Sequence, residues 1–124
     1  MTTRTKIEVR RVYDPPENMD PATCFLVDRL WPRGIRKERL AHCTWLKDVA
    51  PSNALRSAFH QDPTQWDAFR QHYEAELDAN RAAWQPLLDA AARHAIVLLY
   101  GSHDEEHNHA IVLRDYLLRH AKRA

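Results

Sequence analysis

The segment from residue 28 to residue 39 concentrates side chains that can bind an anion. Five of its twelve residues are Arg or Lys and two are Asp or Glu, and Arg29 comes soon after an apolar run. Because guanidinium groups hold phosphate and carboxylate in a bidentate manner, we expect Arg29 and Arg33 to bind an anionic ligand. Trp31 would stack on a ring of that ligand, and Asp28 is a candidate acid or base. The structural alternative is that Arg29 pairs with a carboxylate while Trp31 fills the core.

A second polar segment follows the apolar run that ends at Tyr100. Asp104 and His107 are its candidate acid–base groups, and Tyr100 and Asn108 are candidate ligand-binding residues. The segment also contains helix-starting chemistry, because Ser102 and the glutamate three residues later match a capping box. A helix N-terminus also favours bound anions, so these residues are compatible with both capping and ligand binding.

A third group of candidates consists of Lys47, Asp48 and Ser52. A lysine beside an aspartate can hold an anion or take part in acid–base chemistry, provided that its pKa is shifted. The alternative is a surface ion pair followed by a helix N-cap at Ser52. We retain all three as ligand-binding candidates, because a strand before them would place them beside the first two segments.

The histidines near residue 107 formally match a zinc-peptidase pattern. His103, Glu106 and His107 have the H-x-x-E-H spacing, and His109 follows. That pattern needs both of its histidines inside a helix, whereas Gly101 and the serine after it place His103 at or before a helix cap. We therefore expect no metal and no other cofactor.

Apolar periodicity predicts the elements that carry these segments. Strands are expected over residues 7–13, 24–27 and 96–100, with a weaker one over 42–46. Helices are expected over residues 37–40, after the cap at 52, over 66–77, from a restart or kink at Pro86, and over 105–120. This alternation predicts an α/β fold, small, single-domain and three-layer-like, with a short, mostly parallel sheet of 3–4 strands flanked by helices. The domain would span residues 1–124, with its core at about 7–118.

The carboxyl ends of parallel strands share one edge of the sheet, and ligands of such folds bind there. The loops after residues 27 and 100 should therefore meet, and they contain the two glycines of the chain, Gly34 and Gly101. We expect each glycine where the backbone needs a positive φ or a close approach, and the pair to mark two walls of one cleft. An arginine of the first segment should then come within roughly 10 Å of Asp104 or His107.

The overall composition argues for a local site rather than a charged surface. The chain of 124 residues is 44% hydrophobic and 28% charged, with a net charge of +1. That charge predicts at most weak binding to nucleic acid, and the lack of a long apolar run predicts no membrane span. Two cysteines, Cys24 and Cys43, are too few for a disulfide scaffold, so we expect inert, buried, reduced thiols and a cytoplasmic location.

Several of these motifs together resemble the domain of unknown function 488 family, in its YeaO-like branch. The resemblance spans about residues 7–118, and the stretch that carries it best is Val-Asp-Arg-Leu-Trp-Pro-Arg-Gly at 27–34. It implies a compact bacterial or archaeal α/β domain without an established reaction. The positions that match the family's motifs are Asp28, Arg29, Trp31, Pro32, Arg33, Gly34, Lys47, Asp48, Ser52, Tyr100, Asp104, His107 and Asn108.

Three functions are compatible with the sequence. The first is binding of, or chemistry on, a small anionic ligand, phosphate- or nucleotide-like, at the carboxyl edge of the sheet. The second is a nucleic-acid-binding or regulatory module that uses the basic segment with Trp31 as a stacking residue. The third is a non-enzymatic, partner-binding accessory protein whose motifs are mainly structural. A single pocket favours the first function, and a flat basic face favours the second.

Overall fold

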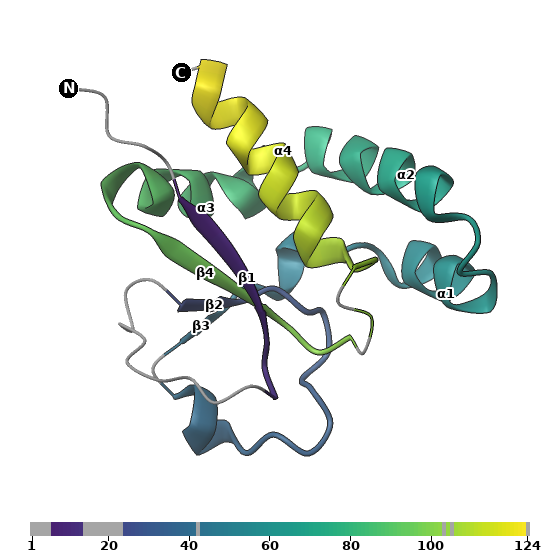
Figure 1. The fold of residues 1–124 in the computed structure, drawn as a ribbon, viewed down its shortest axis with the longest axis horizontal. Helices are drawn as coiled ribbons and strands as arrows, with labels where there is room; N and C mark the ends of the chain where they lie inside the picture. Colours follow the sequence, from purple (N-terminus) through teal and green to yellow (C-terminus); the bar gives the residue numbers. More distant parts are fainter. Residues whose placement is uncertain (1–5, 14–23, 42, 103, 105, 124) are drawn as a thin grey trace.

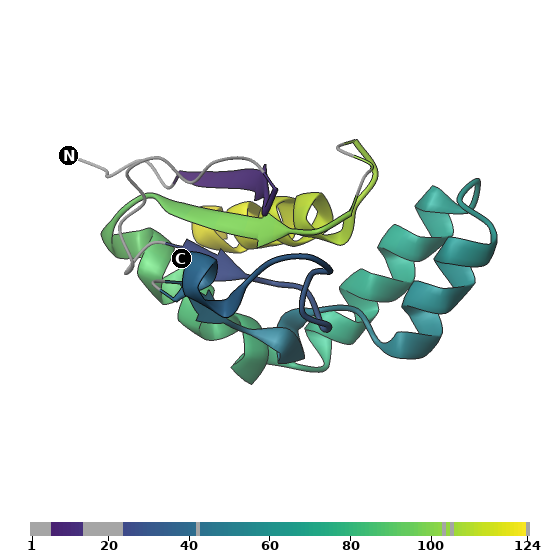
Figure 2. The same cartoon turned by 90° about the horizontal axis from the view of Figure 1, so that it is seen from below.

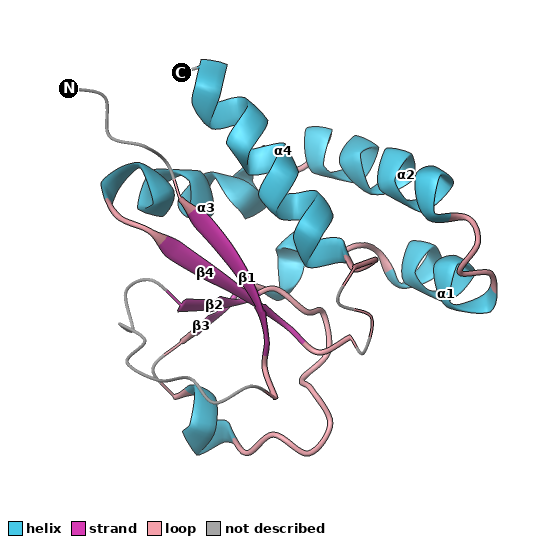
Figure 3. Cartoon of the chain, in the orientation of Figure 1, coloured by secondary structure: helices cyan, strands magenta, loops and turns pink. Residues whose placement is uncertain are grey.

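The fold is described from a computed structural model, for residues 6–13, 24–41, 43–102, 104 and 106–123. Strands and helices alternate along the chain, as the sequence predicts (Figures 1 and 3). Their order is β1 (Ile7–Arg11), β2 (Cys24–Leu26), the 3₁₀ helix η2 (Lys37–Leu40), β3 (Thr44–Trp45), the 3₁₀ helix η3 (Lys47–Val49), α1 (Asn53–Gln61), α2 (Trp66–Asp78), α3 (Arg81–Arg93), β4 (Ile96–Tyr100) and α4 (His109–Arg123).

The four strands form one parallel sheet in the order β1-β4-β2-β3. In Figure 2 the long strands β1 and β4 lie side by side, with the shorter β2 and β3 following them across the sheet. Phe25 pairs with Leu98 on one side and with Thr44 on the other, so β2 is central and β3 is an edge strand. The expected parallel α/β sheet is confirmed, and the weakly predicted third strand exists with two residues.

The sheet separates two apolar clusters. On one face, α2, α3 and α4 pack their buried side chains on the strands, and Tyr73, Trp84 and Leu113 are among the most deeply buried of these. On the other face, Leu40 of η2 and Leu26 of β2 belong to a smaller cluster. Figure 1 shows these helices and the η2 segment on opposite sides of the sheet. Burying apolar side chains on both faces explains why β2 and β4 are almost continuously apolar.

Two helices begin at residues other than those predicted. Helix α3 begins at Arg81 and runs through Pro86, where the sequence predicted a restart or a kink. Helix α4 begins at His109 rather than near residue 105. The difference at α4 arises because Asn108 is the actual cap: its Oδ1 accepts a hydrogen bond from the backbone N–H of Ile111, at 3.1 Å. The glutamate of the expected capping box lies outside the described residues.

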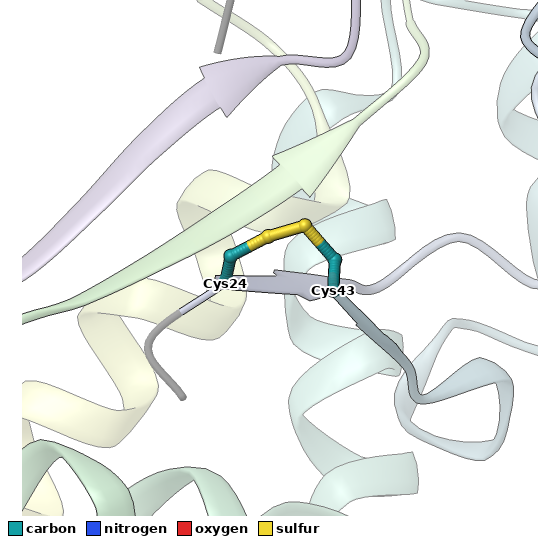
Figure 4. The surroundings of a disulfide bond; sticks show 2 residues. All are labelled: Cys24 and Cys43. Atoms are coloured by element: carbon teal, nitrogen blue, oxygen red, sulfur yellow. A yellow bond between two sulfur atoms is a disulfide. The ribbon is translucent and has the colours of Figure 1, made fainter. Parts of the chain in front are cut away.

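The expectation of reduced thiols is wrong, because Cys24 and Cys43 form a disulfide (Figure 4). Cys24 begins β2 and Cys43 directly precedes β3, so strand pairing brings them together across 19 residues of sequence. Their Cα atoms are 4.8 Å apart, within the range that a disulfide requires. Sequence spacing alone does not reveal such a pairing, since it depends on which strands are neighbours.

Candidate functional site

Asp28 joins the two loops that were expected to meet at the carboxyl edge of the sheet. Its Oδ2 accepts a hydrogen bond from the backbone N–H of Gly101 at 2.8 Å, across 73 residues of sequence. A Cβ atom on Gly101 would lie 2.9 Å from the same oxygen, so a larger residue here would displace the carboxylate. Gly34 has a φ of 80°, the other use expected of a glycine. The shared edge is thus confirmed, with a carboxylate as the link.

His109, the first residue of α4, lies against the same carboxylate. Its Nε2 is 2.9 Å from the carbonyl oxygen of Val27 and 3.2 Å from Asp28 Oδ1. A carbonyl oxygen only accepts, so Nε2 carries a proton directed at Val27. Asp28 Oδ1 is buried and accepts no hydrogen bond of normal geometry within the described part of the chain. Its contact with His109 is therefore an electrostatic one. The pair is partly buried, with 16% of the Asp28 side chain and 15% of the His109 side chain exposed.

Arg29 ties the loop after β2 to the start of α1. Its Nε donates to the carbonyl oxygen of Pro51 at 3.0 Å, and its Nη2 donates to that of Ala50 at 3.1 Å. These bonds correspond to neither expected role, because the partners are backbone carbonyls rather than a ligand or a carboxylate. They use two of the five N–H donors of the guanidinium and fix its orientation toward the start of α1.

Ser52 is the N-cap of α1, as its alternative interpretation predicted. The backbone N–H of Leu55 donates to Ser52 Oγ at 3.2 Å. Glu76 of α2 then accepts from the Ser52 backbone N–H at 2.9 Å and from Ser52 Oγ at 2.6 Å. A carboxylate of the protein itself therefore occupies the positive end of α1. Glu76 was not among the candidates, because only the tertiary structure brings α2 to this point.

Asp104 and Asn108 organise the turn that leads into α4. Asp104 Oδ1 accepts from the backbone N–H groups of Glu106 and His107, both at 2.9 Å, and Asn108 Nδ2 donates to the Asp104 carbonyl oxygen at 2.9 Å. The two backbone bonds lower the pKa of Asp104 from its usual value of 3.8. His107 is exposed, with its ring edge-on to Trp66 and its Nδ1 3.4 Å from Asp104 Oδ2.

The aromatic residues of the first and third segments form one cluster. The rings of Trp31 and Trp45 meet edge to face at 5.3 Å. Trp31 Nε1 donates to the carbonyl oxygen of Ile35 at 2.7 Å, and Trp45 Nε1 donates to that of Asp28 at 2.7 Å. Trp31 is half-buried and Trp45 is 40% exposed, so Trp45 is the better placed of the two to contact a ligand.

A groove of about 240 Å³ lies beside this cluster, where β3 ends and η3 begins. One wall consists of residues 45–49, and the other consists of Ala82, Ala83 and Pro86 in the first turns of α3. Lys47 Nζ lies 5.6 Å from the centre of the Trp45 ring, a cation–π distance. Behind the groove, Tyr73 donates from its hydroxyl to the carbonyl oxygen of Val49 at 2.7 Å, and burial raises the pKa of Tyr73. This wall of the groove thus carries the ammonium group of Lys47 and the exposed ring of Trp45, and the bond from Tyr73 to Val49 supports it from behind.

The family of the chain follows from comparison with known proteins. The model of the DUF488-N3i family, described as the inactive DUF488-N3 subclade, matches residues 6–124. The chain belongs to this family. YeaO of Escherichia coli K12, described as an uncharacterised protein, is 44% identical over 111 residues, which cover 90% of this chain and 96% of YeaO. Rv3073c of Mycobacterium tuberculosis H37Rv, described in the same way, is 37% identical over 119 residues, covering 94% and 98% of the two chains. No solved structure gives a significant match.

The remaining candidate residues of this DUF488-N3i chain lie at separate places in the fold. Arg33 is exposed, and its carbonyl oxygen accepts from the Tyr13 hydroxyl at 2.8 Å. Tyr100 is buried at the end of β4. Asp48 is exposed and lines the groove, and its carbonyl oxygen accepts from Asn80 Nδ2 at 3.3 Å. The candidates thus divide into residues that hold loops together and residues that stay at the surface.

The described residues contain no group of three or more His, Cys, Asp or Glu side chains that could hold a metal ion. His103 of the zinc-peptidase pattern lies outside them. No helix among the described residues has the length and apolar character needed to cross a membrane. Sequence reasoning named His109 only beside the zinc-peptidase pattern and missed its contact with Asp28, which depends on the tertiary structure.

Proposed function

We propose that this domain binds a small anionic ligand, phosphate- or nucleotide-like, in the groove between η3 and α3. The observation that carries the proposal is the placement of Lys47 and the exposed ring of Trp45 in one groove at the carboxyl end of β3. That edge is where ligands of parallel α/β sheets bind. An ammonium group attracts phosphate or carboxylate, and an indole face offers stacking to a planar ring.

The apolar wall of the groove supports the same ligand class. Ala82 and Ala83 lie in the first turn of α3, at the positive end of that helix, and Pro86 adds a third apolar side chain. A groove of about 240 Å³ is below the usual size of a pocket that encloses a drug-sized molecule. A ligand of one ring and one anionic group, partly open to solvent, therefore fits best.

The contacts of the candidate catalytic residues favour ligand binding without catalysis. Asp28 and Asp104 use their carboxylates on backbone N–H groups, and His107 lies at the surface beside Trp66. The subclade to which the chain belongs is described as inactive, which agrees with this assignment. We also keep the cytoplasm as the proposed location, although the disulfide removes the support that reduced thiols would have given it.

A titration with matched variants tests the groove. Inorganic phosphate, nucleoside monophosphates and simple carboxylates are added to the wild-type protein while the indole N–H resonance of Trp45 is followed by NMR. Lys47→Met should weaken the binding of the best ligand about tenfold, the effect of losing a charge-assisted hydrogen bond of about 1.4 kcal/mol. Lys37→Met removes the same charge from an exposed position on η2 and should change affinity less than about twofold.

Two outcomes contradict the proposal. One is the absence of saturable binding by the wild-type protein across the whole panel. The other is equal loss of affinity in Lys47→Met and Lys37→Met, which would indicate attraction to general positive charge. In that case the second candidate function, weak binding of nucleic acid by the basic segment, gains support.

A further inference from the structure

The disulfide closes the loop that carries most of the first motif. Cys24 and Cys43 lie at the two ends of a stretch that contains Asp28, Arg29 and Trp31. They are the two cysteines of the chain, so no other pairing within one molecule competes with this one. The disulfide also lies directly before the groove, since Trp45 follows Cys43 by two residues.

Apart from the disulfide, β3 is held to the sheet by few interactions. It has two residues, both exposed, and among the described strands it pairs with β2 alone. The Leu46 backbone N–H donates to the Leu26 carbonyl oxygen at 2.8 Å just beyond the strand, and the Trp45 indole bonds to the backbone of Asp28. A two-residue edge strand has too little ladder to be stable on its own. The end of the groove wall at Trp45 therefore depends on the covalent link more than the end at Val49, which Tyr73 holds from the core.

We propose that the Cys24–Cys43 disulfide is a reversible redox switch that sets the affinity of the groove for its anionic ligand. The proposal rests on the function proposed above, since it assigns a regulation to the same groove. In the oxidised protein the link holds β3, and with it Trp45 and Lys47, against β2. In the reduced protein β3 keeps its short ladder and the hydrogen bonds of Leu46 and Trp45 but loses its covalent link, so the arrangement that binds the ligand is populated for part of the time. Apparent affinity falls in proportion to that population.

The chemistry is thiol–disulfide exchange with a small-molecule thiol of the glutathione class. Cys43 is partly exposed and Cys24 is 1% exposed, so the incoming thiolate attacks Sγ of Cys43. A mixed disulfide forms at Cys43, and the sulfur of Cys24 leaves as a thiolate that takes a proton. A second small thiol then displaces the first from Cys43. Two electrons reduce the protein disulfide to two thiols, and the two small thiols leave as their own disulfide.

Amide hydrogen exchange and ligand titration on the same samples test the switch. The wild-type protein is equilibrated with mixtures of reduced and oxidised glutathione, and its thiols are counted by alkylation and mass spectrometry. Reduction should speed exchange of the Leu46 amide about tenfold, in line with a wall that opens most of the time. The Phe69 amide of α2, which donates to Gln65 and whose side chain packs in the core cluster on the other face of the sheet, is the internal control and should not change. A double variant, Cys24→Ala with Cys43→Ala, should behave as the reduced protein in every mixture.

The two readouts separate the switch from the proposed function. Support for the switch is faster Leu46 exchange together with about tenfold weaker binding of phosphate or nucleoside monophosphate, both reversed on oxidation. Unchanged Leu46 exchange with phosphate binding intact in both states overturns the switch alone. A disulfide that glutathione does not open also overturns it. Absence of phosphate and nucleotide binding in both states overturns the proposed function, and the groove is then not the target of the switch.

Discussion

Substitution of Gly101 by alanine isolates the contact that joins the two loops of the site. The added Cβ would lie 2.9 Å from Asp28 Oδ2 and 3.5 Å from Pro32 Cβ. The second distance is an ordinary van der Waals contact, whereas the first is too short, so the carboxylate must move away. The same oxygen accepts a hydrogen bond from the Gly101 N–H at 2.8 Å, and this bond must lengthen as the carboxylate moves.

The expected cost follows from two opposing effects. Loss of a hydrogen bond to a charged, mostly buried carboxylate destabilises by about 1.5–3 kcal/mol. Alanine in place of glycine restricts the unfolded chain and stabilises by about 0.4–1 kcal/mol where the backbone accepts it. Gly101→Ala should therefore lower the free energy of unfolding by about 1–2 kcal/mol. In urea this corresponds to a midpoint lower by about 1 M for a protein of this size.

A double-mutant cycle with Asp28→Ala shows whether the carboxylate is the cause. In the Asp28→Ala background no oxygen opposes the new Cβ, so Gly101→Ala should be neutral or stabilising by up to about 1 kcal/mol. Urea unfolding of the four proteins, followed by circular dichroism, gives the coupling energy. If Gly101→Ala costs the same in both backgrounds, the contact with Asp28 does not explain the glycine, and the link between the loops is not energetically significant.

The other predictions concern the residues that organise the site. Arg29→Lys keeps the charge but loses the planar fork that holds two neighbouring carbonyl oxygens, and it should lower the free energy of unfolding by about 1–3 kcal/mol, whereas an unchanged urea midpoint would remove Arg29 from this role. Asn108→Ala removes the buried cap of α4 and should cost about 0.5–2 kcal/mol in the same assay, against little change for the exposed Asn53→Ala. The pKa of Asp104 is lower in the folded chain, so its contribution to stability is complete above its usual value of 3.8 and is lost as the pH falls through the lower folded value. Thermal unfolding of Asp104→Asn across that acid range should therefore show a weaker pH dependence than the wild type, and identical profiles would refute it. Duplex DNA should bind weakly, without sequence preference and with strong salt sensitivity, and nanomolar selective retardation at physiological salt would favour the nucleic-acid function instead.

The fold was predictable where apolar runs are long or strongly periodic. The run at residues 96–100 became β4, and the stripe of Phe69, Tyr73 and Leu77 became the buried face of α2. The start of α4 was misplaced because several residues before it can cap a helix. Ser102, Asp104 and Asn108 all have side-chain oxygens that accept backbone hydrogen bonds, and Asn108 is the cap because its side chain also reaches the Asp104 carbonyl.

The meeting of the two loops was predictable from the sequence, whereas the partners of their side chains and the groove beside α3 were not. The rule for parallel sheets brought the loops after β2 and β4 to one edge, which is where Asp28 meets Gly101. The sequence could not show that Arg29 would bond to carbonyl oxygens or that Glu76 would cap Ser52, because these partners lie 21 or more residues away. The disulfide was missed for the same reason, since Cys24 and Cys43 meet only once β2 and β3 pair.

The first motif mainly binds the backbone of distant segments, and this bears on where its function lies. Asp28 reaches Gly101 across 73 residues, Arg29 reaches Pro51 across 22, and the indole of Trp45 returns to Asp28 across 17. A side chain held by such bonds positions the loops that it joins. The ligand binding that we propose then falls to exposed groups beside these loops, and Lys47 and Trp45 in the groove are such groups. A motif that fixes loops in this way is compatible with a family described as an inactive subclade, because holding three loops together requires no reaction.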